Sequence, residues 1–423
     1  MRRLEIKSCI RAAAALALLV CTAGTRAVAE PPAPAVIKIG SLHAASGAYA
    51  SISMPVYDGL KLWIDRTNAD GGAFVKAYGR KIKLQLISYD DQSNPGTAAT
   101  LINQLITQDH VDLLVGDSGS VLTAVAVPIA REHKMMLFDP TGTGAKFFTH
   151  DNPYIALLAD PASTIWPKYL ADFLINQGVK DGLKKVAILY STNDFTSTQH
   201  EALVGFIKAS HAPIDIVFDQ GVPTSTSNYT TLIGNIAAAS PDAVIELGYV
   251  GNDIAFLRNL QDSGQTFRFI FALYPGIETD EIVKNVGAQG IDHVFSYVTA
   301  QALDYKPTVG MDVATYRQAF ETAYRSQGVA FGFNAIAGYT VGLMIGQTLG
   351  AADSLDQLAL RRALFAQSGH VRTLDGPFEL DATGQQIGEI TPLGQLIAHG
   401  NTVTNVVVYP PSLATGKPVY TTP

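Results

Sequence analysis

Two short polar loops, each directly after an apolar stretch, hold the residue types best able to do chemistry in this sequence. Gly116-Asp-Ser-Gly-Ser120 follows 111–115, and Asp139-Pro-Thr-Gly-Thr143 follows 135–138. A short apolar stretch that ends at a small polar loop is typical of a buried strand. Parallel strands end at the same edge of a sheet, where open α/β sheets bind their ligands. We therefore expect both loops to face one ligand.

The tetrapeptide Gly116-Asp-Ser-Gly119 matches the sequence around the nucleophile of chymotrypsin-like proteases. A nucleophilic serine needs a base within hydrogen-bond reach, and those all-β enzymes supply it from a distinctive histidine loop. No such loop is visible here, and the nine histidines lack the spacing of a helical zinc site. A nucleophile elbow, a P-loop and a dinucleotide fingerprint are also missing from the sequence. We expect no enzyme, no metal and no cofactor, and keep a serine hydrolase as a remote alternative.

The two loops suit anion binding better than catalysis. A helix predicted from about Val121 would direct its free backbone N–H groups and its partial positive charge at the first loop. The hydroxyl groups of Ser120 and Thr143, beside the backbone of Gly142, would complete a cradle for a carboxylate. The alternative is that these side chains only cap helices.

Strand and helix patterns alternate along the chain and would hold the loops in place. Strands followed by helices of about ten to fifteen residues predict right-handed βαβ units and parallel sheets. The pattern restarts near Ala162, so we expect two sheets in succession, and Pro55 is placed in the first turn of the first helix. The predicted strands are 36–40, 82–86, 111–115, 135–138, 186–190, 214–218, 243–247, 267–273 and 294–298, and the last three helices are predicted at 314–326, 334–352 and 355–367.

The helix predicted at 334–352 carries four glycines, spaced four residues apart, on one face. They are Gly338, Gly342, Gly346 and Gly350. Such a stripe occurs in membrane helices that dimerise, but this helix is short and its neighbours are polar. We expect it to pack closely on a sheet or on another helix.

The composition is that of a globular protein with a leader. A chain of 423 residues, 47% hydrophobic and 16% charged, can bury a large core in two or three domain-sized units. Residues 1–29 have the pattern of a secretory signal that is cleaved after Ala27-Val-Ala29, and they contain both cysteines, Cys9 and Cys21. The formal net charge of −7 argues against nucleic-acid binding.

Several short motifs occur together in a specific order. They are Ile37-Lys-Ile-Gly40, Ser46-Gly47, 68–72, Tyr89-Asp-Asp91, 116–120, 139–143, Phe256-Leu-Arg258 and Asp262-Ser-Gly264. With these motifs the chain resembles the periplasmic receptors of ABC importers in the Leu/Ile/Val-binding family, over essentially its whole length after the signal. The resemblance implies an α/β fold of two Rossmann-like lobes with parallel sheets, joined by three crossovers that form a hinge.

The resemblance also implies how the chain is divided and what it does. Lobe 1 would comprise 36–159 and 298–372, and lobe 2 would comprise 160–297 and 373–423. Such a protein is periplasmic and presents a branched-chain amino acid, or a related carboxylate or amide, aromatic ones included, to an ABC permease in the inner membrane. We expect a monomer. The alternative is a ligand-sensing receptor module of the same fold, and neighbouring permease and ATPase genes would favour transport.

The resemblance assigns ligand contacts as well. Ser120 and Thr143 would bind the ligand carboxylate through their hydroxyl groups, aided by the backbone of Ser118 and Gly142. Aromatic side chains would wall the pocket, although the family aromatic of the first loop aligns closer to Ile52 than to the nearby tyrosine. The aromatic candidates are Tyr49, Phe195, Tyr249 and Tyr274, and Trp166 is a further aromatic residue that would suit an aromatic or aliphatic ligand.

One position departs from the amino-acid binders of this family. They carry an acidic residue just after the strand that ends here at Ala272, where it holds the ligand ammonium group, but this chain has Leu273-Tyr-Pro-Gly276. Burial of an ammonium group without a carboxylate would be costly. Either Asp139, Asp117 or Asp160 substitutes for the missing acid, or the ligand is not an α-amino acid. Asp139, in the second loop, is the first candidate.

Overall fold

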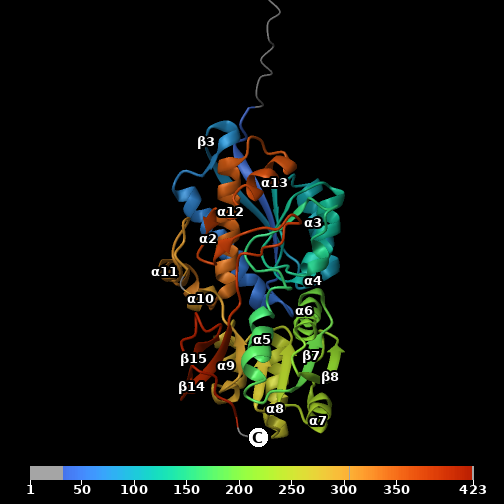
Figure 1. Cartoon of the computed structure of the whole chain (residues 1–423). Helices are drawn as coiled ribbons and strands as arrows, with labels where there is room; N and C mark the ends of the chain where they lie inside the picture. Colours follow the sequence, from blue (N-terminus) through green and yellow to red (C-terminus); the bar gives the residue numbers. More distant parts are fainter. Residues whose placement is uncertain (1–31, 304, 422–423) are drawn as a thin grey trace, which may run out of the picture. The chain divides into compact units, whose positions relative to one another are not determined.

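The computed structural model describes residues 32–303 and 305–421 (Figure 1). The chain divides into residues 1–34 and 35–423, and the described helices and strands all belong to the second part. The predicted signal peptide, with Cys9 and Cys21, lies outside the described residues.

The first sheet is built around strand β1, which is paired in parallel with β3 and β4. The order of its six strands is β2-β3-β1-β4-β5-β6, and only the short β2 runs antiparallel to its neighbour. The strands are β1 Val36–His43, β2 Ala73–Val75, β3 Arg80–Asp90, β4 Leu113–Val115, β5 Leu137–Asp139 and β6 Ile155–Leu157. Their connecting helices are α2 Ala50–Ala69, α3 Pro95–Thr107 and α4 Ser120–Glu132.

The second sheet has seven strands in the order β15-β14-β11-β10-β9-β7-β8. Five of them are parallel, and the hairpin β14-β15 adds two antiparallel strands. The strands are β7 Lys185–Ser191, β8 Asp215–Val222, β9 Ala243–Leu247, β10 Phe269–Ala272, β11 Phe295–Tyr297, β14 Leu393–His399 and β15 Thr402–Tyr409. Its helices are α5 Lys168–Phe173, α6 Asp194–Ser210, α7 Thr230–Ala238, α8 Val250–Ser263 and α9 Thr279–Val286.

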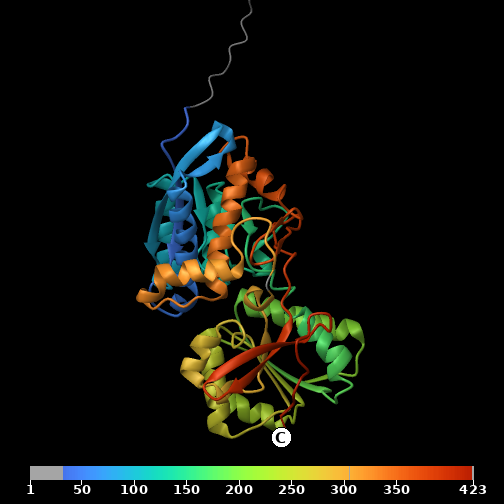
Figure 2. The same cartoon turned by 90° about the vertical axis from the view of Figure 1, so that its left-hand side faces the viewer.

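The chain returns to the first sheet after β11 and then completes the second sheet with β14. The returning elements are α10 Ala300–Leu303, α11 Val313–Tyr324, α12 Phe333–Ala351, α13 Gln357–Phe365 and the paired strands β12 Val371–Arg372 and β13 Pro377–Phe378. Figure 2 shows α12, in orange, beside the blue α2 on the first sheet. The chain therefore passes between the sheets three times, after β6, β11 and β13, and the predicted fold class of two α/β lobes is confirmed.

The glycine stripe lets α12 and α2 pack closely. A Cβ atom at Gly338 would lie 1.9 Å from the carbonyl oxygen of Val56, and one at Gly342 would lie 2.5 Å from the ring of Trp63. No side chain larger than hydrogen fits at such distances. None of the described helices is long and apolar enough to cross a membrane. Gly346 also lies against Trp63, whereas Gly350 faces open space, so three of the four glycines have the predicted packing role.

Two local predictions near the chain start are wrong. Pro55 does not lie in the first turn of its helix, because Ile52 and Ser53 donate backbone hydrogen bonds to Tyr49 and so start α2 a turn earlier. Strand β1 also continues through Ser41–His43, which the sequence assigns to a loop, because its pairing with β3 extends to the end of that strand. Both errors concern the ends of elements, which depend on hydrogen-bond partners that the sequence pattern does not show.

Candidate functional site

A small cavity, the inner cavity, lies between the carboxyl ends of the two sheets. Its volume is about 20 Å³, little more than one water molecule needs. It is lined by Ile52, Ser118, Gly119, Thr141, Asp160, Trp166, Phe195, Tyr249, Tyr274, Phe333 and Asn334. Both sheets and the first passage between them contribute to this lining, so the cavity occupies the ligand position expected of an open α/β sheet.

The first sheet supplies the polar wall of the inner cavity. Ser118 and Gly119 follow β4, and Thr141 follows β5. The hydroxyl group of Thr141 accepts a hydrogen bond of 2.8 Å from the backbone N–H of Gly119 and lies 3.0 Å from the hydroxyl group of Ser118. Gly119, at φ 88°, turns the chain into α4. Two hydroxyl groups therefore gather at the start of α4, whose partial positive charge suits an anion.

Three predicted residues of these loops lie beneath the polar wall and do not line the cavity. The hydroxyl group of Thr143 is 2.7 Å from that of Ser163, and the hydroxyl group of Ser120 accepts a hydrogen bond from the backbone of Gly144. Gly142 is also absent from the lining. Serine and threonine recur two residues apart in each loop, and the structure turns the earlier one of each pair toward the cavity.

Asp139 is also placed beneath the cavity. Its carboxyl group is fully buried and accepts hydrogen bonds from the hydroxyl group of Thr123 at 2.9 Å and from the backbone N–H of Gly142 at 2.7 Å. Burial raises the pKa of Asp139 to about 7, against the effect of these two bonds. Because both oxygens are engaged and the residue does not line the cavity, Asp139 supports the loop and is not in reach of a ligand there.

The second sheet supplies an aromatic wall. Phe195 follows β7, Tyr249 follows β9 and Tyr274 follows β10, and all three line the cavity. The ring centroids of Phe195 and Tyr249 are 5.5 Å apart, and those of Tyr249 and Tyr274 are 6.3 Å apart. Trp166 packs edge-on against Phe195 at 5.3 Å. Such contacts form a rigid apolar surface with few rotatable bonds.

Tyr49 does not line the cavity, in contrast to the prediction. Its ring packs edge-on against Tyr249 at 5.6 Å, and Ile52, one turn further along α2, faces the cavity instead. The aromatic contact joins the first lobe to the second beside the cavity.

Asp160 carries the only carboxyl group among the described lining residues. Its side chain is 4% exposed, and its Oδ1 atom has no hydrogen-bond partner among the described residues. Burial, and then the nearby carboxyl groups of Asp375 and Asp139, raise the pKa of Asp160 well above its ordinary value. The lining contains no lysine or arginine, so a cation would be stabilised at this carboxyl group.

The loop after β10 brings no acid to the cavity. The backbone N–H of Tyr274 donates a hydrogen bond of 2.6 Å to Asp253, whose carboxyl group is buried against that of Glu246 below the wall. Asp117, another of the predicted substitutes, accepts hydrogen bonds from Ser53 and from the backbone of Ser118 and does not line the cavity. Of the three predicted substitutes, Asp160 alone reaches the cavity.

Sequence reasoning missed four of the lining residues: Gly119, Thr141, Phe333 and Asn334. Gly119 and Thr141 lie inside the two predicted loops, so their neighbourhood carried the signal. Phe333 and Asn334 begin α12, whose approach to the cavity depends on the second passage between the sheets. No group of three histidine, cysteine, aspartate or glutamate side chains in the described part of the chain is placed to hold a metal ion.

Two α/β sheets that face one small cavity and are joined by three passages define the class of type I periplasmic binding proteins. A sequence model of the family described as periplasmic binding protein matches residues 36–400. The chain therefore belongs to this family of solute-binding proteins.

Individual relatives agree with this assignment. Leu/Ile/Val-binding protein homolog 8 of Brucella suis biovar 1 (strain 1330) is 24% identical over 416 residues, covering 94% of this chain and 95% of its own. The isoleucine complex of LivJ, a branched-chain amino acid transporter substrate binding protein from Streptococcus pneumoniae, has a TM-score of 0.73 and 18% identity, covering 89% of this chain and 100% of its own. The benzoate complex of an ABC transporter solute binding protein from R. palustris has a TM-score of 0.70 and 19% identity, covering 88% and 96%. These structures share the fold of this chain.

Proposed function

We propose that this protein is the extracytoplasmic solute-binding component of an ABC importer and that its ligand is an apolar α-amino acid of the branched-chain type. Family membership and the relatives named for leucine, isoleucine and valine support the transport role. The inner cavity supports the ligand class, because its lining combines hydroxyl groups that can donate to a carboxylate, a carboxyl group for an ammonium, and apolar rings.

The observation that carries the proposal is the position of Asp160. An amino acid whose carboxylate lies at Ser118 and Thr141 would need a negative partner for its ammonium group, and Asp160 is the one carboxyl group of the described lining. The acids around it, Asp375 and Asp139, add negative potential and no compensating cation. This arrangement favours a zwitterion over a simple carboxylate such as benzoate, which would meet Asp160 without a positive charge.

Binding requires the two walls to separate and close again. The volume of about 20 Å³ is far below that of a leucine side chain with its charged groups. Both walls belong to different sheets, and the connections between them are the three passages, so a hinge motion would admit the ligand and closure would bury it. The closed form would then be presented to a membrane permease.

A thermal-shift panel tests the ligand class, because a ligand that binds only the folded state raises the melting temperature. The panel contains L-leucine, L-isoleucine, L-phenylalanine, 4-methylpentanoate, benzoate and cinnamate. We expect stabilisation by leucine or isoleucine and none by 4-methylpentanoate, which lacks only the ammonium group. Stabilisation by benzoate or 4-methylpentanoate without leucine would replace the amino acid by a simple carboxylate.

A further inference from the structure

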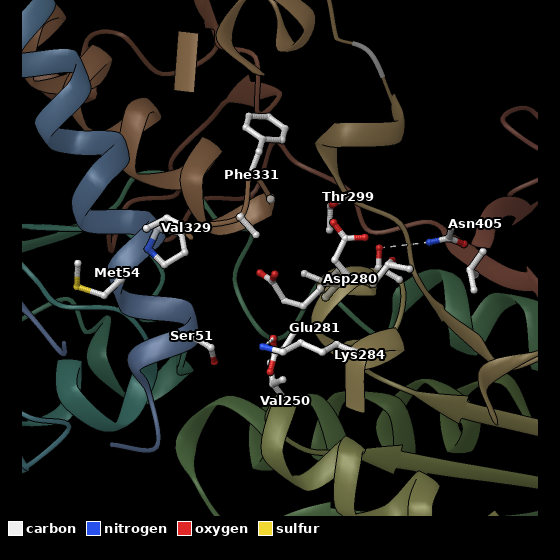
Figure 3. Close-up of a pocket in the computed structure, with 18 of the residues that line it drawn as sticks. Ser51, Met54, Val250, Asp280, Glu281, Lys284, Thr299, Val329, Phe331 and Asn405 are labelled. Atoms are coloured by element: carbon white, nitrogen blue, oxygen red, sulfur yellow. Dashed lines mark hydrogen bonds and ion pairs between the residues drawn. The ribbon is translucent and has the colours of Figure 1, made fainter. Parts of the chain in front are cut away.

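A second and larger cavity, the outer cavity, adjoins the inner cavity. Its volume is about 730 Å³, and its lining includes the starts of α2, α8 and α9. Figure 3 shows Ser51 and Met54 on one side of it and Val250, Glu281 and Lys284 on the other. The two cavities share no lining residue, but neighbouring residues in the sequence line different cavities. Ser51 and Val250 line the outer cavity, whereas Ile52 and Tyr249 line the inner cavity. Only a thin layer of side chains therefore separates them.

One hydrogen bond in this layer joins the two lobes. Asn334 is buried and lines the inner cavity, and its Nδ2 atom donates to Oε1 of Glu278, which lines the outer cavity. Glu278 directly precedes α9 on the second sheet, whereas Asn334 lies in the first turn of α12, which packs on α2 of the first sheet. The bond can therefore exist only while the lobes are together.

The same bond fixes how Asn334 presents its amide group. Because one N–H of the amide group is donated to Glu278, the amide oxygen and the second N–H are the groups left for a ligand, and the oxygen is the one that can accept from a donor in the inner cavity. Glu278 also lies close to Gly332, the residue that precedes α12. A Cβ atom added at Gly332 would lie 3.3 Å from the Oε2 atom of Glu278. We propose, resting on the function proposed above, that Glu278 is a positioning residue that orients Asn334 toward the ligand and couples lobe closure to the uptake of a proton.

Electrostatics give the sign of this coupling. Burial, and then repulsion from Asp280 and Glu281, raise the pKa of Glu278 to about 8, against the effect of the Asn334 bond. The other titratable groups near it are Tyr274 and, in the lining of the outer cavity, Lys284 and Arg317. Glu278 is half-buried while the lobes are together, and their separation exposes its carboxyl group further and returns its pKa toward the ordinary value, so closure takes up a proton. The closed state is therefore favoured as the pH falls below about 8 and loses this advantage as the pH rises through that value.

A ligand-free measurement tests the coupling. Spin labels on cysteines at Ser51 and Gly251, two exposed positions on opposite lobes, report closure in the protein without residues 1–29, which contain the two native cysteines Cys9 and Cys21. We expect the closed fraction to increase between pH 9 and pH 6 in the wild type, by at most about tenfold per pH unit for one proton. In Glu278→Gln, which keeps an acceptor for Asn334, this increase should be lost.

Glu281→Gln is the matched control, because Glu281 also lines the outer cavity but hydrogen-bonds Asn285 and lies next to Lys284. It should keep a pH-dependent closed fraction, shifted to lower pH because Glu281 is one of the charges that raise the pKa of Glu278. The same pH dependence in Glu278→Gln and the wild type would overturn the coupling, whether or not a ligand has been identified.

Affinity for L-leucine tests the orientation of Asn334. We expect Asn334→Ala to lose at least about tenfold in affinity, as for a lost hydrogen bond to a charged group. Glu278→Ala should lose a similar factor, and Glu278→Gln should restore most of it at pH 8.5. If Glu278→Ala binds leucine as the wild type does, the positioning role is wrong. If no compound of the panel binds, the proposed function fails while the pH response without ligand is still measured.

Discussion

The two walls of the inner cavity occupy equivalent positions in their sheets but differ in chemistry. The first wall, Ser118, Gly119 and Thr141, offers hydroxyl groups and a helix start. The second wall, at the ends of β7, β9 and β10, offers the rings of Phe195 and Tyr249 and their neighbour Tyr274. Equivalent strand ends can therefore divide a binding task, one wall fixing the orientation of a charged group and the other selecting the apolar part of the ligand.

Below their surfaces the walls are alike, because each rests on a buried carboxyl group. Asp139 accepts from the backbone N–H of Gly142 under the first wall, and Asp253 accepts from that of Tyr274 under the second. Burial raises the pKa of both carboxyl groups to about 7, with Glu246 as a further neighbour of Asp253. Asp160 differs from both: it belongs to the passage between the sheets and it reaches the cavity.

Removal of the charge of Asp160 should have the largest effect. Asp160→Asn should weaken L-leucine by about 2–5 kcal/mol, the loss found when one partner of a buried charge pair is removed. The affinity for 4-methylpentanoate should not fall, because it has no ammonium group. Isothermal titration calorimetry of both compounds measures the contrast between the two ends of the ligand.

The same variant has a stability readout that separates binding from folding. Asp160→Asn should melt at a higher temperature than the wild type without ligand, because a neutral amide replaces a buried carboxyl group that lies near other acids. Unchanged leucine affinity in a stable Asp160→Asn protein would remove Asp160 from the site.

The aromatic wall should act without regard to charge. Tyr249 contacts Tyr49, Phe195 and Tyr274, so Tyr249→Ala should weaken any apolar ligand by about 2 kcal/mol, a typical loss for a buried aromatic contact. Tyr249→Phe keeps the ring and should bind nearly as the wild type. If Tyr249→Ala changed the preference between leucine and 4-methylpentanoate, the division between the walls would be wrong.

The sequence predicted the fold well because its strands are continuously apolar and its helices regular. Strand 243–247 was predicted at the observed β9. The three predicted aromatic residues that follow strands of the second sheet reach the cavity. These features depend on local periodicity and on the rule that loops at one edge of a parallel sheet meet.

The remaining site residues depend on long-range placement that local patterns do not encode. Whether Thr141 or Thr143 faces the cavity is decided by Ser163 and Gly119, which hold one hydroxyl group each. Asn334 comes from a helix that returns to the first sheet. Asp139 is the first candidate from the sequence for the acid that binds the ligand ammonium group, because it lies in one of the two polar loops, whereas Asp160 lies outside them. A single sequence shows which polar groups exist but not which of them are already satisfied.

Thr141 and Thr143 provide a direct test of the polar wall. Thr141→Val, nearly the same size, should weaken a carboxylate by about 1–2 kcal/mol because it removes a hydroxyl group from the cavity lining and the acceptor for Gly119. Thr143→Val removes only the bond to Ser163 beneath the wall and should affect stability more than affinity. Titrations and chemical unfolding of both variants distinguish the two positions, and a larger affinity loss in Thr143→Val would reverse the assignment.

The smallest expected effect concerns the support of the first wall, Asp139. Its ordinary pKa of 3.8 applies to the unfolded chain, whereas burial raises the value to about 7 in the folded protein. Unfolding therefore releases a proton between about pH 4 and pH 7, so the contribution of Asp139 to stability is present below that range and is lost as the pH rises through it. Asp139→Asn should be less stable than the wild type by about 1 kcal/mol at pH 5, because an amide oxygen replaces only one of the two acceptors.

At pH 8 this difference in stability should shrink, since the wild type then carries a buried charge. Urea unfolding at both pH values measures it, with the exposed Asp65→Asn on α2 as control. An equal difference at pH 5 and pH 8 would show that Asp139 does not titrate in this range.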